Sequence, residues 1–230
     1  MEPLKPPGSG GESRGSVSSG TAGAAVAGAT LIAVFGPPVG ISPAWIAVGL
    51  GGLLVGLTVD ASQWEGLGGH LLAESLPGGR ARLRRIACHE AGHVLLARDN
   101  QLPVQRVMVG TRACLQAGVR SNGATEFAIP DSVRMSLEDL RRWSRVLQAG
   151  IAAETLLYGS ARGGADDRAL LGRLWGLSGH DVDTAQREQR RARREVDQWL
   201  RSQRQSLEDT ADALLRAPLA TTVSPQSSAD

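Results

Sequence analysis

The sequence is poor in cysteine, lysine, histidine and aromatic residues. Among its 230 residues are two cysteines, four histidines and one lysine, and aromatic side chains make up 3% of the chain. Cys88 and Cys114 do not resemble the disulfide framework of a small secreted domain, so we expect the main domain to lie in a reducing compartment. The net charge of +2 is too small to indicate nucleic acid as a partner, and none is expected.

Charge is absent altogether from residues 15–59, although charged residues make up 21% of the chain. This segment holds two apolar stretches, 22–36 and 44–59, separated by the helix-breaking sequence PPVGISP. Each stretch is slightly shorter than the roughly 20 residues that an untilted helix needs to cross a bilayer. The pattern therefore predicts a two-helix hairpin, embedded in the lipid bilayer, that turns at residues 37–43.

Flanking residues support the membrane interpretation and suggest an orientation. Trp45 and Trp64 bracket the second stretch, where interfacial aromatic residues are common, and glycine-rich spans suit close helix packing. The arginines of residues 80–85 predict that the following domain lies on the cytoplasmic side, or on the stromal side in a plastid. Two alternatives are a cleaved targeting segment followed by one span, and a buried soluble hairpin.

Composition divides the chain into five segments. The first and last are predicted to be disordered because they are rich in small, polar and proline residues. Most of the remaining charge lies after the apolar stretches, in a part long enough to bury a core of its own. The expected segments are a disordered tail at 1–20, a membrane anchor at 21–60, a linker at 61–80, a folded domain at 81–217 and a second disordered tail at 218–230.

Local signals predict that the folded domain is mainly α, with a small β segment (α+β). A helix is expected from about Arg82 to Arg98, and a β segment at 103–121 with a turn near 110–112. The remaining expected helices run from a capping box at Ser136 to about Tyr158, from near Asp166, and as one long arginine-rich helix over about 181–215.

The sequence ACHEAGHVLLA, which begins at Ala87, contains an H-E-x-x-H motif. On a helix, His89 and His93 lie one turn apart on the same face, so both imidazoles can bind one metal ion. Glu90 stands beside that face, where a general base can take a proton from water on the metal. The structural alternative is an amphipathic helix in which the two histidines have no special role.

A catalytic zinc site needs a third protein ligand and one open coordination position. The downstream candidates are Glu154, Asp166, Asp167 and His180. Glu154 lies in a helical apolar run, whereas the two aspartates follow a Gly-Gly pair at a predicted helix start, where aspartate is also a common N-cap. Spacing alone does not choose among the four.

The stretch IACHEAGHVLLA resembles the motif helix of the peptidase domain in FtsH-type membrane zinc proteases. The resemblance continues in the same order along the chain and covers about residues 86–215. Three further stretches are similar to that family's strand segment, its G-G-R-A-A-E-E-L-x-F-G helix and its T-G-A-x-N-D-L segment, namely LPVQRVMVGTRACLQAG, LQAGIAAETLLYG and RGGADDRALL.

The resemblance implies a helical zincin-like peptidase domain in which Zn²⁺ is bound by His89, His93 and Asp167, with Glu90 as the catalytic base. The chain departs from the family in three respects. It contains no G-x-x-x-x-G-K-[ST] motif, so the ATPase module is absent from it; Thr111-Arg112 replaces Arg-Gly; and RLWGLSG lies closer to the aspartate than the family's W-G-M-S does.

The function implied by the resemblance is that of a membrane-anchored zinc metalloendopeptidase. It would hydrolyse unfolded or membrane-associated polypeptides without its own ATPase, and its candidate partners are a separate ATPase, an FtsH-like protein or further copies of itself. An intramembrane protease is disfavoured, because Arg84–Arg85 and Arg98–Asp99 bracket the motif and are costly to place in lipid. A non-proteolytic FtsH-like scaffold or assembly factor in the membrane remains the alternative.

Overall fold

The computed structural model describes residues 28–63, 66–128 and 134–218, and it divides into two compact units at 1–66 and 67–230. The predicted disordered tail at 1–20 lies outside the described residues. The same holds for Trp64 and for the tail at 218–230 except Pro218.

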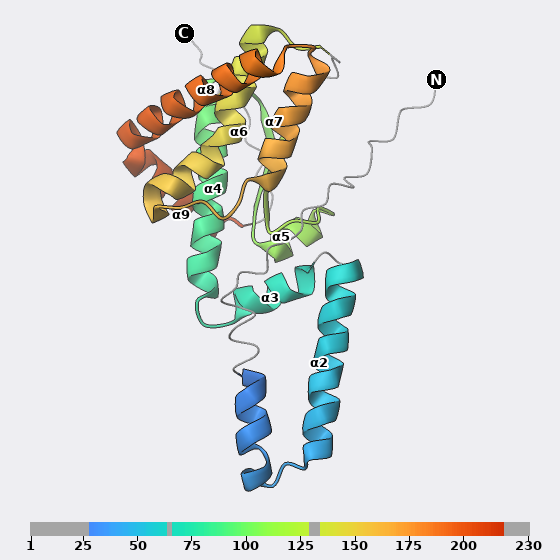
Figure 1. Ribbon diagram of the computed structural model, residues 1–230. Helices are drawn as coiled ribbons and strands as arrows, with labels where there is room; N and C mark the ends of the chain where they lie inside the picture. Colours follow the sequence, from blue (N-terminus) through green and yellow to red (C-terminus); the bar gives the residue numbers. More distant parts are fainter. Residues whose placement is uncertain (1–27, 64–65, 129–133, 219–230) are drawn as a thin grey trace. The chain divides into compact units, whose positions relative to one another are not determined.

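The first unit contains a helix at residues 28–35, a 3-10 turn η1 (Pro37–Val39) and the helix α2 (Pro43–Gln63) (Figure 1). The turn ends at Gly40, whose φ of 88° is a left-handed conformation that favours glycine. At Gly36 a Cβ atom would meet the side chain of Ile46, so glycine permits close packing beside the turn.

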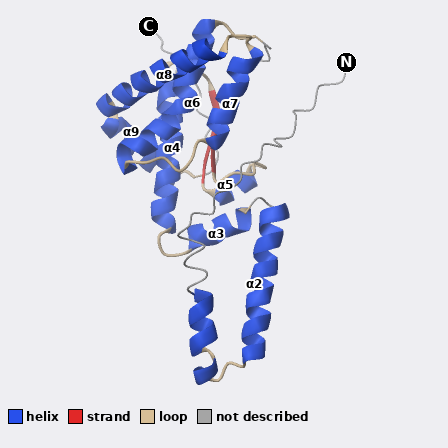
Figure 2. Ribbon diagram, in the orientation of Figure 1, coloured by secondary structure: helices blue, strands red, loops and turns tan. Residues whose placement is uncertain are grey.

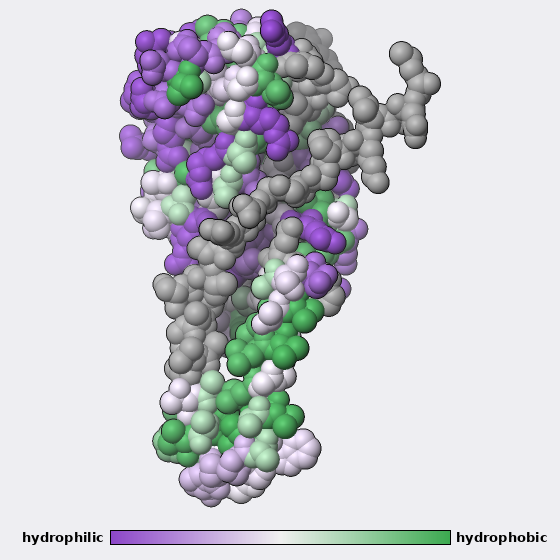
Figure 3. All heavy atoms as spheres, turned by 45° about the vertical axis from the view of Figure 1, so that its right-hand side comes forward, coloured by the Kyte–Doolittle hydropathy of each residue, from purple (hydrophilic) through white to green (hydrophobic). Residues whose placement is uncertain are grey.

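Among the described residues, α2 is the helix that is long and apolar enough to cross a membrane. Its apolar side chains are exposed rather than packed in a core; Leu54 and Val55 are each 65% exposed. Figure 3 shows such apolar residues gathered on the surface of this unit. That α2 could cross a membrane is inferred from its length and composition alone.

The second unit is mainly helical with a two-stranded sheet, as the sequence predicts (Figure 2). Its elements are α3 (Leu67–Ser75), α4 (Gly79–Asp99), β1 (Val104–Val109), α5 (Thr111–Gln116), β2 (Gly123–Phe127), α6 (Leu137–Tyr158), α7 (Ala165–Leu177), α8 (Val182–Ser202) and α9 (Arg204–Arg216). The predicted linker at 61–80 therefore contains the end of α2 and all of α3, and the compact unit begins at Leu67.

The core of this unit forms around α4, which packs against α6 and α9. Small residues allow the approach: a Cβ atom at Gly92 would lie 2.7 Å from the carbonyl oxygen of Ala149. Ala87, Ala91 and Ala153 are completely buried in the same core. Close packing of α4 on α6 holds the H-E-x-x-H segment against a second helix.

The two strands pair antiparallel, with Met108 opposite Ala124 and Val109 opposite Gly123. The prediction that residues 112–121 continue the β segment is wrong, because α5 occupies the first half of that stretch and the second strand begins only at Gly123. The carboxylate of Glu74 in α3 accepts hydrogen bonds from the backbone nitrogen and the hydroxyl of Thr111, at 2.8 and 2.7 Å. These bonds satisfy a donor that is otherwise free at a helix start.

The long helix predicted over 181–215 is also wrong, because it breaks at Gln203 into α8 and α9. The break lets α8 pack on α6 while α9 turns to pack on α4. Leu207, Ala211 and Leu214 are buried on the second of these faces. A single straight helix would not place both apolar faces against their partners.

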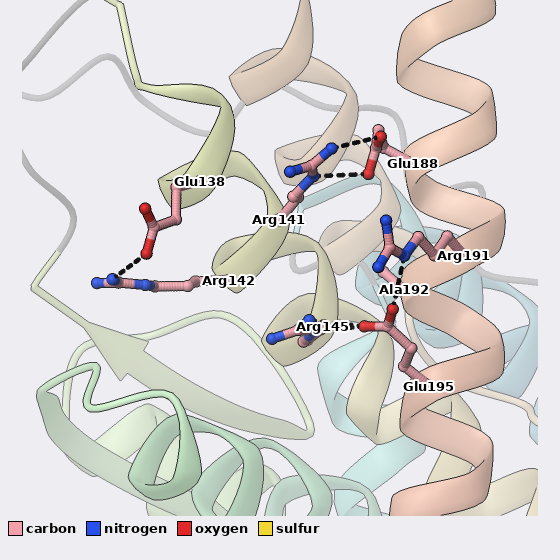
Figure 4. A pocket seen from close by; sticks show the side chains of 8 residues that line it. All are labelled: Glu138, Arg141, Arg142, Arg145, Glu188, Arg191, Ala192 and Glu195. Atoms are coloured by element: carbon pink, nitrogen blue, oxygen red, sulfur yellow. Dashed lines mark hydrogen bonds and ion pairs between the residues drawn. The ribbon is translucent and has the colours of Figure 1, made fainter.

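Paired charges line the surface pocket between α6 and α8 (Figure 4). Arg141 binds Glu188 through two hydrogen bonds of 2.8 Å, and Arg145 lies 2.7 Å from Glu195, which also accepts from Arg191. These charges neutralise one another, so the pocket is an ion-paired contact between two helices. The H-E-x-x-H residues do not line it.

Candidate metal centre

Two histidines on α4 and one aspartate on α7 form the centre of the site. His89 and His93 are 8% and 2% exposed, and their ring centroids are 4.8 Å apart. The Oδ2 atom of Asp167 lies 3.1 Å from Nε2 of His89 and 3.4 Å from Nε2 of His93. The structure therefore brings together the three residues that the family resemblance implies, as a group that could bind a metal ion.

The other nitrogen of each imidazole is held by a hydrogen bond. Nδ1 of His89 lies 2.8 Å from Oε1 of Glu154, and Nδ1 of His93 lies 2.8 Å from the carbonyl oxygen of Val146. When Nδ1 donates to these acceptors, the lone pair of a neutral ring is on Nε2, facing Asp167. Such partners orient histidine ligands in metal sites.

Glycine on α6 leaves space where the two imidazoles meet. A Cβ atom added at Gly150 would collide with Nε2 of both His89 and His93. The helix thus has no side chain at the point where a metal ion would face its ligands. Two imidazole nitrogens and one carboxylate oxygen are a donor set that Zn²⁺ binds in hydrolytic enzymes, so the residues present fit zinc.

Glu154, one of the four candidate third ligands, lies behind His89 rather than beside Asp167. Its carboxylate accepts from Nε of Arg85 at 2.6 Å and from the backbone nitrogens of Arg162 and Gly163 at 2.9 and 3.1 Å. Burial raises its pKa, but the hydrogen bonds with His89, the Arg162 backbone and Arg85 outweigh that effect and lower the pKa to about 2. Glu154 is therefore an ionised residue that orients His89 and fixes the loop before α7.

The other two candidates lie away from the three-residue group. Asp166 is exposed in the first turn of α7, although it is adjacent to Asp167 in the sequence. The ring of His180 packs edge-on against Trp175, with the ring centroids 5.6 Å apart. The helical phase of α7 thus separates two neighbouring aspartates that spacing alone does not distinguish.

Glu90 is 4% exposed, and its Oε2 atom accepts a hydrogen bond of 2.7 Å from the hydroxyl of Thr125 on β2. A Cβ atom at Gly123 would lie only 2.8 Å from its Oε1 atom, so glycine makes room for the carboxylate. Burial raises the pKa of Glu90, against the opposing effect of the two histidines. Thr125 was not predicted from the sequence, because no motif links it to a residue on another element.

Burial and charge act in opposite directions on the ligand residues. Burial lowers the pKa of His89, but hydrogen bonds with Asp167 and Glu154 raise it overall to about 10. Burial raises the pKa of Asp167, whereas the charges of His93 and His89 hold it well below its usual range. Without a metal ion, these effects favour a protonated His89 ring beside an ionised Asp167.

Comparison with known proteins does not assign a family to this chain. No protein-family model matches the chain, and no curated protein is significantly similar to it. The residues themselves, two buried imidazoles facing one carboxylate beside a buried glutamate, are what identifies the site as a candidate metal centre.

Proposed function

We propose that the chain is a membrane-anchored zinc metalloendopeptidase, in which His89, His93 and Asp167 hold the metal and Glu90 is the general base. The observation that carries the proposal is the convergence of the three ligand atoms within 4.8 Å of one another, with Glu90 next to His89 on the same helix. A buried group of this composition next to a buried carboxylate is the arrangement that H-E-x-x-H hydrolases use.

Zinc held by His89, His93 and Asp167 would supply Lewis-acid polarisation of a carbonyl and would lower the pKa of water to about 7. The residues of the chain transfer the proton and orient the ligands. Glu90 holds the proton taken from the water and returns it to the leaving amine, and Thr125 keeps the carboxylate in place through its 2.7 Å hydrogen bond. Glu154 and the carbonyl of Val146 fix the imidazole orientations.

The expected substrates are unfolded or membrane-associated polypeptides. The chain contains no P-loop sequence, so it carries no recognisable motor of its own for unfolding substrates. An ATPase, an FtsH-like partner or further copies of the chain would present substrates to the site. The length and composition of α2 support an integral membrane location, and the arginines at residues 80–85 support a cytoplasmic or stromal peptidase domain.

The proposal is tested with the full chain purified in detergent and assayed for zinc content and for cleavage of unfolded casein. The zinc-loaded protein should cut casein, chelator treatment should abolish cleavage, and added zinc should restore it. Asp167→Ala should lose both zinc and cleavage, whereas Asp166→Ala, its exposed neighbour, should keep both. A zinc-loaded protein that never cleaves would favour the scaffold alternative.

A further inference from the structure

Two exposed leucines lie side by side at the end of α3: Leu72 within the helix and Leu76 directly after its last residue, Ser75. Leu72 and Leu76 are 62% and 61% exposed, although leucine side chains are usually buried. They are four residues apart, and the backbone nitrogen of Leu76 donates to the carbonyl oxygen of Leu72 at 3.1 Å, so the helical turn continues through both. Residues at this spacing lie next to each other on a helix surface.

Other residues of α3 pack against the rest of the second unit, to which this helix belongs. Leu67 is 7% exposed, and the Glu74 carboxylate is bonded to the backbone nitrogen and the hydroxyl of Thr111 in α5. At Gly79, the first residue of α4, a Cβ atom would collide with the backbone of Glu74. The face with Leu72 and Leu76 is therefore held outward by packing, not by the conformation of a flexible linker.

The chain length between α2 and α3 limits what can cover this face. The helix α2 ends at Gln63 and α3 begins at Leu67, so residues 64–66 are all that separates them. Four Cα steps span at most about 14 Å when fully extended. The polar zone of a bilayer is about 5–8 Å thick on each side of the hydrocarbon core. If α2 crosses the membrane and Gln63 lies at the edge of the hydrocarbon core, α3 starts within about 14 Å of that edge, inside the polar zone or a few ångströms beyond it.

We propose that the apolar face formed by Leu72 of α3 and by Leu76, which directly follows the helix, lies in the interfacial region of the lipid bilayer, as a second membrane contact of the peptidase unit. This inference rests on the proposed membrane anchor. An exposed apolar face with a charged flank is what interfacial helices use, and the exposed Arg80 follows the two leucines closely. Arginine at this position is attracted to anionic lipid headgroups.

The contact would keep the metal centre close to the membrane surface. The helix α4 begins four residues after Ser75, and His89 is ten residues into it, which is about 15 Å along a helix axis. A peptidase seated in this way favours polypeptide segments that emerge from the bilayer over chains free in solution.

Site-directed spin labelling of the full chain in vesicles of phosphatidylcholine and phosphatidylglycerol tests this contact. Cys88 and Cys114 are buried, so a label attaches preferentially to an introduced cysteine. The test positions are Leu72→Cys and Leu76→Cys. The control is Leu177→Cys on α7, a leucine that is 54% exposed. A further variant, Leu54→Cys in α2, reports on the anchor itself.

Labels at residues 72 and 76 should be several-fold more accessible to oxygen, and several-fold less accessible to a water-soluble nickel chelate, than the label at residue 177. Equal accessibility at all three positions overturns the inference, and so does protection from both reagents, which indicates a protein contact. A lipid-exposed label at residue 54 with aqueous labels at 72 and 76 refutes the α3 contact and leaves the anchor standing. An aqueous label at residue 54 refutes both. A circular dichroism spectrum that matches that of the unmodified protein shows that each variant is folded.

Discussion

At the scale of single residues, the site consists of ligands and of the groups that orient them. His89 and His93 each have one nitrogen bonded to an acceptor on α6 and the other facing Asp167. This division fixes which nitrogen is available to a metal ion. Glu154 is an acceptor for four donors, and its removal would leave His89 and Arg85 without that partner.

The hydrogen bond from Thr125 to Glu90 predicts a positioning role that depends on a hydroxyl. Thr125→Val removes the donor and keeps the shape of the side chain, so kcat should fall by about 10–100-fold while zinc content is unchanged. Thr125→Ser, which keeps the hydroxyl, should restore most of the rate. Peptidase kinetics with metal analysis measure both effects. Equal kcat values for the valine variant and the unmodified protein would show that Glu90 needs no such support.

The raised pKa of His89 predicts that metal binding releases protons. Because that pKa is about 10, the ring is protonated at neutral pH without metal, and a metal ion has to displace the proton. Apparent zinc affinity should therefore rise with pH, by about tenfold per pH unit for each proton released. Competition with a chromophoric chelator at several pH values measures this dependence. Affinity that does not change between about pH 6 and 8 would contradict it.

At the scale of elements, the site depends on how closely α6 approaches α4. The approach requires glycine or alanine at the contact, notably Gly92 on α4 and Gly150 on α6. Gly150 is the more direct case, because the missing side chain borders the ligand nitrogens themselves.

Gly150→Ala should therefore abolish zinc binding although alanine favours helices more than glycine does. Its matched control is Gly172→Ala on α7, where an added Cβ atom meets nothing within 4 Å. The control should bind zinc normally and should be neutral or stabilised by up to about 1 kcal/mol. Metal analysis and thermal unfolding of the two variants provide the comparison. Normal zinc content in Gly150→Ala would refute the role assigned to this glycine.

Elements with local signals were predictable, and elements set by tertiary contacts were not. The N-cap of α6 is confirmed, since the hydroxyl of Ser136 accepts from the backbone nitrogen of Asp139 at 3.0 Å. The helix α5 depends on Glu74, which is 37 residues from Thr111 in the sequence, and the break at Gln203 depends on the packing of α9. In the site, the H-E-x-x-H motif is a local signal that the sequence shows directly. Which of Asp167 and Glu154 faces both histidines depends on the positions of α6 and α7, which spacing does not show.

At the scale of the whole molecule, the proposal joins a membrane anchor to a peptidase domain. The first predicted span is helical over residues 28–35, turns at η1 and continues into α2. If both predicted spans cross the bilayer as a hairpin, both ends of the chain lie on the same side of the membrane. Tags at the N-terminus and after Asp230 should therefore be equally accessible to added protease in sealed vesicles. Opposite accessibility would support one span instead.

The central claim is that a zinc site with Glu90 as its base hydrolyses peptide bonds, and the kcat of Glu90→Gln in the zinc-loaded full chain tests it most directly. Glutamine is close to glutamate in size and can still bond with Thr125, so the fold and the zinc content should be unchanged. The loss of the carboxylate should lower kcat on unfolded casein by about 10²–10⁴-fold. If Glu90→Gln binds zinc and cleaves casein as fast as the unmodified protein, Glu90 is not the base and the account is wrong.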